Sequence, residues 1–144
     1  MINLYLLRHG EAAAMAPTDS QRPLTEHGRQ QVAVSAGLLP QLDLMVASPY
    51  LRAQQSAQIV AETVAIAKQS TSETITPDSS PSDVVAWLET VDAESILLVT
   101  HNPFVSQIAS WLTGDLGIGF RTGTLAHLQG DFVGPNCMTL KSLS

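Results

Sequence analysis

Arginines and histidines follow three short apolar stretches of this sequence, at the points where each stretch ends. The groups are Arg8 and His9 after residues 4–7, Ser48 and then Arg52 after residues 43–47, and His101 after residues 95–100. Arginine offers a planar fork of donors that suits phosphate, and histidine can act as a nucleophile or an acid/base at neutral pH. Gly10 would allow a tight turn or a positive φ, so that His9 could face a cavity. Taken alone, Arg-His-Gly is equally typical of a strand followed by a solvated turn, and the rest of the chain must decide.

The elements that would position these groups alternate between strands and helices. Residues 2–8, 43–47 and 95–100 are apolar runs typical of buried parallel strands. The first expected helix runs from 26, after a Thr25 cap, to about 39, where Pro40 stops it. The second starts at a Ser48 cap, with Pro49 in its first turn, and reaches about 67. The third opens at a capping box at 80–83, and the fourth runs from after Pro103 to Gly114. A short strand is expected near 73–76, and 125–128 and 138–143 are expected as antiparallel edge strands.

This alternation predicts an α/β fold: a three-layer α/β/α sandwich around a mostly parallel central sheet with an antiparallel edge strand, in a single domain over 1–144. Ligands of such sheets bind beyond the carboxyl ends of the strands. We therefore expect Arg8, His9 and His101 on one rim. Arg52, one turn into its helix, can reach back to that rim, where helix N-termini add N–H donors. Together these residues form an anion site that suits a phosphoryl group.

The amino-acid composition of the chain limits the classes of partner that it could bind. The chain is 44% hydrophobic and 14% charged, with a net charge of −6, which argues against nucleic acid and anionic membrane as partners. No apolar stretch approaches the roughly 20 residues that span a bilayer, and no basic leader precedes the first one, so a cytoplasmic location is expected. Cys137 is the only cysteine, and neither zinc spacing, a P-loop nor an acidic magnesium cluster is present. We expect no metal and no cofactor.

Four segments, in order and spacing, resemble the histidine phosphatase superfamily, also called the phosphoglycerate mutase-like or Arg-His-Gly family. They are Leu7-Arg8-His9-Gly10-Glu11, Arg22-Pro23-Leu24-Thr25, Ser48-Pro49-Tyr50-Leu51-Arg52-Ala53 and Thr100-His101-Asn102-Pro103. The resemblance covers about residues 2–112. The small size of the chain and the His-Asn-Pro form of the last segment are similar to the SixA-type phosphohistidine phosphatase branch.

The resemblance implies a role for each matching residue. His9 would be the nucleophile and would form a transient phosphohistidine. Arg8, Arg52 and His101 would take part in catalysis by holding the phosphoryl oxygens, and Arg22 would add a substrate-binding cation from the loop.

The protonation states of the two histidines follow from these roles. His9 must be neutral at its attacking nitrogen, so its other nitrogen should donate to a fixed acceptor such as the carbonyl of Gly10. Crowded cations would disfavour its protonation. His101 is more useful as a protonated donor, and a bound phosphate would favour that state.

One departure from the family concerns the general acid. Many members carry an acidic residue between the second helix and the third strand, where residues 68–83 offer Glu73, Asp78 and Asp83 without a matching motif. No acid is assigned. Phosphohistidine tolerates this, because its leaving imidazole is easily protonated, whereas a sugar alkoxide needs an acid.

The resemblance therefore implies a metal-independent phosphatase, whose partner would be a phosphohistidine-bearing signalling or phosphotransfer protein. One alternative is a phosphomonoesterase or mutase acting on a small phosphorylated substrate. The short segment 68–83 weighs against it, because small-molecule sites enclose most of their ligand. The other alternative is a non-catalytic module that binds phosphoproteins, and His9 weighs against it, because binding alone needs no nucleophile.

Overall fold

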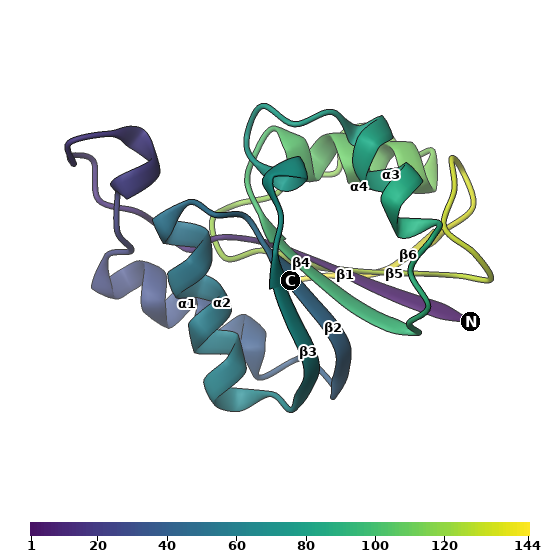
Figure 1. Ribbon diagram of the computed structural model, residues 1–144, viewed down its shortest axis with the longest axis horizontal. Coiled ribbons are helices and arrows are strands. Elements are labelled where there is room, and N and C mark those ends of the chain that lie inside the picture. Colours follow the sequence, from purple (N-terminus) through teal and green to yellow (C-terminus); the bar gives the residue numbers. More distant parts are fainter.

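The computed structural model describes residues 1–144, and its centre is a six-stranded sheet in the order β3-β2-β4-β1-β5-β6 (Figure 1). The strands are β1 (Ile2–Arg8), β2 (Leu42–Ala47), β3 (Ile66–Thr71), β4 (Ser95–Thr100), β5 (Leu125–Gly130) and β6 (Thr139–Leu143). Strands β3, β2, β4 and β1 are parallel, whereas β5 pairs antiparallel with β1, and β6 antiparallel with β5. The expected mostly parallel sheet with an antiparallel edge is confirmed.

Helices cover both faces of this sheet. They are α1 (Glu26–Ala36), α2 (Leu51–Thr63), α3 (Pro81–Leu88) and α4 (Phe104–Thr113), with short 3₁₀ turns η1 (Asp19–Gln21) and η2 (Glu73–Ile75). Figure 1 shows α1 and α2 on one face and α3 and α4 on the other, which is the expected three-layer sandwich. None of these helices has the length and apolar character to cross a membrane.

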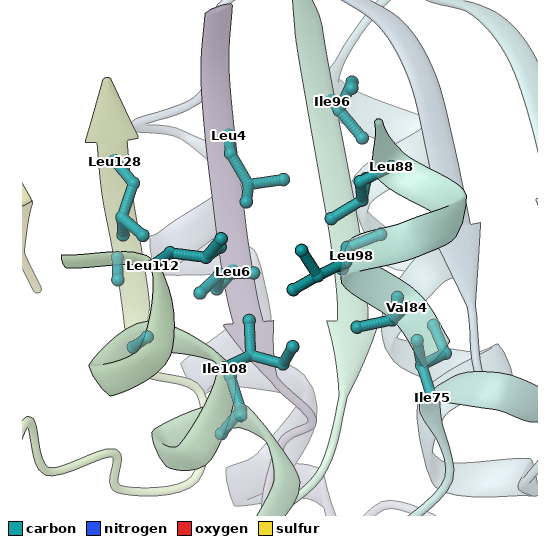
Figure 2. Close-up of a cluster of buried hydrophobic side chains, with 14 of the residues drawn as sticks. Leu4, Leu6, Ile75, Val84, Leu88, Ile96, Leu98, Ile108, Leu112 and Leu128 are labelled. Carbon is teal, nitrogen blue, oxygen red and sulfur yellow. The ribbon is translucent and has the colours of Figure 1, made fainter. Parts of the chain in front are cut away.

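The strands read as continuous apolar runs because both of their faces are buried. Along β1, Leu4 and Leu6 belong to the core under α3 and α4, while Tyr5 and Leu7 belong to the core under α1 and α2. Figure 2 shows Leu4 and Leu6 of β1 packed among side chains from β4, α3 and α4. Removing one fully buried leucine such as Leu98 would cost about 2–5 kcal/mol of stability.

The register of the central strands aligns their carboxyl ends. Arg8 of β1 pairs with Thr100 of β4, and Ala47 of β2 pairs with Val99. The residues that follow continue the pattern, because the His9 N–H donates to the carbonyl of Thr100 over 3.0 Å. The next residue of each strand, including His9 and His101, therefore emerges at the same edge of the sheet.

The segment after α2 differs from its sequence-based prediction. The helix expected to reach about residue 67 ends at Thr63, residues 66–71 form β3, and the strand expected near 73–76 is the 3₁₀ turn η2. Strand β3 lies at the edge of the sheet, and all of its residues are exposed except Ile66, which is half-buried. A strand of exposed side chains carries no period-2 pattern, so pairing with β2 decides its conformation.

Helix starts confirm one expected cap and correct two others. The Thr25 hydroxyl accepts from the Gly28 N–H over 3.0 Å, as expected for the α1 cap. Pro49 lies before α2, which begins only at Leu51, so it does not occupy the first turn. Ser80 occupies the N-cap position of α3 as expected, but its side chain makes no cap bond, so the expected capping box does not form.

Two of the four helices, α1 and α4, end at glycines. Helix α1 ends at Ala36 and is capped by Gly37, before the expected stop at Pro40. Gly114 caps α4 with φ of 79°, the left-handed conformation that glycine adopts without strain, so its predicted role is confirmed.

Candidate active site

His9 lies directly beyond β1 and is only 6% exposed. Its Nδ1 lies 2.7 Å from the carbonyl oxygen of Gly10, which confirms the expected acceptor. A carbonyl can only accept, so Nδ1 carries the ring proton and Nε2 keeps its lone pair. The Nε–H of Arg52 donates to that Nε2 over 3.3 Å. His9 therefore presents an unprotonated nitrogen to the arginine of the site.

A glycine is needed at position 10 for a reason that the sequence did not predict. The φ of Gly10 is not positive, so of the two expected possibilities, a tight turn or a positive φ, the second is wrong. A Cβ at this position would collide with the carbonyl of Gly28 in α1. The Gly10 N–H donates to the hydroxyl of Ser56 over 3.2 Å. Glycine is thus required because helix α1 packs directly against the backbone that carries His9.

Arg52 reaches back to the rim from the first turn of α2 and is 4% exposed. Besides His9, it bonds to the loop before α1: Nη1 donates to the backbone carbonyl of Asp19 over 2.8 Å, and Nη2 to its carboxylate over 3.2 Å. The guanidinium carbon lies 5.0 Å from the ring centre of Tyr50. Every nitrogen of Arg52 is engaged, so its fork is held in place before any substrate arrives.

His101 follows β4 and is fully buried. Its Nε2 lies 2.7 Å from the hydroxyl of Ser48, the residue predicted to cap α2. The ring centres of His101 and His9 are 5.0 Å apart, and the ring of Tyr50 stands edge-on to His101 at the same distance. Ser48 is therefore a site residue that sequence reasoning assigned to a helix end.

Arg8, the last residue of β1, is tied to the loop before β5. Its Nη1 donates to the carbonyl of Phe120 over 2.9 Å, and the Asn102 side chain donates to the same oxygen over 3.0 Å. The Nε of Arg8 and the Nδ1 of His101 are buried without a partner. A buried N–H donor without a partner costs about 1–3 kcal/mol, so an oxyanion that accepts from the Arg8 Nε–H would remove that cost.

Arg22 joins the site through a carboxylate. Its Nε donates to Asp19 over 2.9 Å, and its Nη1 donates to the carbonyl of Ala13 over 3.1 Å. Asp19 thus bridges Arg22 and Arg52. All five predicted site residues are brought together: Arg8, Arg52 and His101 lie around His9, and Arg22 joins them through this bridge.

Burial and charge keep His9 neutral. Burial, assisted by the charges of Arg52, Arg8 and Arg22, lowers the pKa of His9 to about 4, against the opposing bond to Gly10. At neutral pH the imidazole is therefore unprotonated and nucleophilic.

His101 is neutral as well. Burial lowers its pKa to about 3, assisted by His9 and Arg52. In the free site His101 is therefore unprotonated. The protonated state expected from the sequence belongs to the phosphate-bound site, where the anionic charge would raise the pKa of His101.

The carboxylate of the site is Asp19, which sequence reasoning missed. Glu73, Asp78 and Asp83 are exposed, and none of their carboxylates bonds to a site residue. Burial raises the pKa of Asp19, but the bonds from Arg22 and Arg52 outweigh it, so this pKa lies below its usual value. Asp19 begins the three-residue turn η1, within a connecting segment that shows no hydrophobic periodicity. Its position three residues before Arg22 was the available signal.

Comparison with known proteins agrees with this geometry. Residues 4–74 match the histidine phosphatase superfamily (branch 1). The chain is 33% identical to the phosphohistidine phosphatase SixA homolog of Haemophilus influenzae, covering 90% of this chain and 89% of that protein. It is 28% identical to phosphohistidine phosphatase SixA of Escherichia coli, covering 90% and 86%.

Solved structures place the fold in the same group. The structure of the protein histidine phosphatase SixA complexed with tungstate superposes with a TM-score of 0.90 at 25% identity, covering 99% of this chain and 96% of that one. The chain belongs to the histidine phosphatase superfamily, and it is a phosphatase and thus a hydrolase. Within the superfamily it is similar to the SixA proteins.

Proposed function

We propose that this phosphatase removes the phosphoryl group from phosphohistidine on another protein, with His9 as the nucleophile. The observation that carries the proposal is the state of His9: Nδ1 bonded to the Gly10 carbonyl, and Nε2 unprotonated beside Arg52. The SixA relatives are named phosphohistidine phosphatases, which supports the choice of substrate.

The reaction proceeds in two balanced steps. The Nε2 lone pair of His9 attacks phosphorus, the P–N bond of the substrate breaks, and its electron pair returns to the departing imidazole nitrogen. The Nδ1 of the new phosphohistidine keeps its proton and continues to donate it to the carbonyl oxygen of Gly10. Water then attacks phosphorus, one of its protons passes to a phosphate oxygen, and the bond to Nε2 breaks. Inorganic phosphate departs, and His9 returns to the neutral imidazole that began the cycle.

Three further residues hold the phosphoryl oxygens. Arg8 and Arg52 supply directed N–H donors, and His101 supplies a third donor once the bound phosphate raises its pKa. The buried Nε of Arg8 and Nδ1 of His101 have no protein partner, which supports an oxyanion as the missing one. Arg22 adds positive charge from the loop.

A protein substrate is favoured by the segment between α2 and α3. Part of it forms edge strand β3, and Ile75 in the following turn is fully buried. The Thr100 hydroxyl donates to the carbonyl of Ile75 over 2.6 Å, which fastens the turn to β4. A segment held against the core does not close over a ligand, and an open site suits a phosphohistidine presented by another protein. Signalling and phosphotransfer proteins of the cytoplasm are the partners we infer.

A turnover screen tests the proposal. Phosphate release is measured with a phosphohistidine peptide, a phosphoserine peptide and a sugar phosphate, each with wild type and His9→Ala. We expect kcat/KM to be highest for phosphohistidine and turnover to be lost in His9→Ala. Preference for the sugar phosphate would instead assign a small-molecule phosphomonoesterase. Binding of phosphopeptide without phosphate release would assign a binding module.

A further inference from the structure

We propose that Asp19 selects substrates whose leaving group carries positive charge, by accepting a hydrogen bond from the departing imidazole. This inference rests on the proposed function and adds a residue that contacts the substrate, together with a reason for discrimination between phosphohistidine and phosphate esters.

The position of Asp19 follows from one side chain. Arg52 donates from Nε to His9 and from Nη2 to the Asp19 carboxylate. The Nε–H and one Nη2–H of a guanidinium are the parallel pair that grips a phosphate or carboxylate. The carboxylate thus faces the same edge of Arg52 as the attacking nitrogen. A phosphoryl group held by that edge lies next to Asp19.

The difference in burial places Asp19 on the side of the leaving group. His9 is 6% exposed, whereas the side chain of Asp19 is 61% exposed. Attack from Nε2 is in line, so the leaving group lies on the far side of phosphorus. Since His9 is buried, the far side is the solvent side, where the Asp19 carboxylate stands at the rim.

The carboxylate has both the charge and the capacity for this role. Arg22 and Arg52 each donate to it, and a carboxylate offers about four lone-pair sites, so it can accept a further N–H. Its lowered pKa keeps it ionised at neutral pH. It therefore serves as an acceptor and not as a general acid.

The chemistry of the two leaving groups then differs. A phosphorylated imidazole departs readily when its second ring nitrogen is protonated, because breaking the P–N bond then releases neutral imidazole. An anionic acceptor favours that protonated form. An ester leaves with developing negative charge on oxygen, which the same carboxylate repels.

The experiment measures kcat/KM at one neutral pH for phosphoimidazole and p-nitrophenyl phosphate, with wild type, Asp19→Asn and Asp19→Glu. We expect Asp19→Asn to lower the ratio of the two values roughly tenfold or more, the size of a charge-assisted hydrogen bond. Loss of the negative charge should raise turnover of the aryl ester. Asp19→Glu should restore part of the ratio.

Asp19→Asn keeps the backbone carbonyl that holds Arg52, so the arginine stays in place. Asp78→Asn, an exposed carboxylate outside the site, is the matched control.

The outcomes separate this inference from the proposed function. If wild type prefers phosphoimidazole and Asp19→Asn changes both substrates by the same factor, Asp19 only positions or competes for Arg52, and the inference is overturned. If wild type hydrolyses the aryl ester but not phosphoimidazole, the proposed function itself fails, and this inference fails with it.

Discussion

The two halves of the site are held in different ways. The scaffold half, defined as Arg8, His9, Arg52 and His101, comes from strand ends and the first turn of a helix, and its side chains are largely buried. The loop half, Asp19 and Arg22, comes from the irregular segment between β1 and α1, which stands out in dark purple at the left of Figure 1. Their side chains are 61% and 29% exposed.

This difference suggests a division of labour. Ion pairs at exposed positions contribute only about 0–1 kcal/mol, so the Asp19–Arg22 pair can rearrange around a substrate at little cost. The buried groups are already oriented by Gly10, Ser48 and Phe120. We therefore expect the scaffold half to carry the chemical step and the loop half to adjust which substrates reach it.

The largest effect should come from removing His9, the proposed nucleophile of the scaffold half. His9→Ala should lower kcat by roughly 10⁴-fold or more, as loss of a catalytic nucleophile does in other enzymes. A quenched reaction of wild type with labelled substrate should leave acid-labile, base-stable label on the protein. His27→Ala, an exposed histidine of α1, is the control, and circular dichroism checks the fold. Sustained turnover by His9→Ala would refute the assignment.

The next effect compares one arginine from each half. Arg52→Ala should lower kcat/KM by roughly 10²–10³-fold, like loss of an oxyanion donor, because its fork is buried and fully engaged. Arg22→Ala should lower kcat/KM only about tenfold, because the partly exposed Arg22 side chain loses more conformational entropy when it binds. Steady-state kinetics of both variants, with the exposed Arg29→Ala as control, test the ranking. A larger loss at Arg22 would reverse the division of labour.

Burial of two neutral histidines should make stability pH-dependent. The folded pKa values are about 4 for His9 and about 3 for His101, against about 6.5 when unfolded. Between these values the unfolded chain binds more protons. The stability that these two neutral histidines contribute is therefore complete above about pH 6.5, and it is lost as the pH falls through about 4 and about 3. Urea denaturation across this range should show the decline, and the double variant His9→Asn/His101→Asn should show a shallower one. An equal slope in both proteins would contradict it.

The smallest effect should be that of a chelator. In the proposed function, the positive charge that faces the phosphoryl group comes from arginines in both halves, so we expect turnover to be unchanged by EDTA. The assay compares treated and untreated enzyme with the phosphohistidine peptide. Loss of activity that magnesium restores would mean that a metal shares the work assigned to Arg8 and Arg52.

Sequence reasoning was most successful where one local property decides the structure. Residues 2–8 and 95–100 are apolar on both faces, and only a buried parallel strand satisfies such a run. The ends of those strands then place His9 and His101 by topology alone. The Gly10 carbonyl was predictable as the partner of His9 because it belongs to the adjacent residue.

Sequence reasoning failed where the deciding contact is distant. Strand β3 takes its conformation from β2, and Gly10 is needed because Gly28 of α1 approaches it. Ser48 turns from a predicted helix cap into the partner of a histidine that lies 53 residues away in sequence.

By itself, the sequence determined the alternation of strands and helices, the rim on which its arginines and histidines gather, and the family to which the chain belongs. Hydrophobic periodicity and short motifs are local, so they survive without coordinates. Only the tertiary structure decided that Asp19 spans Arg22 and Arg52, and that burial lowers the pKa of His9 to about 4. Burial and charge proximity depend on which distant segments meet, and no local pattern in the chain encodes that meeting.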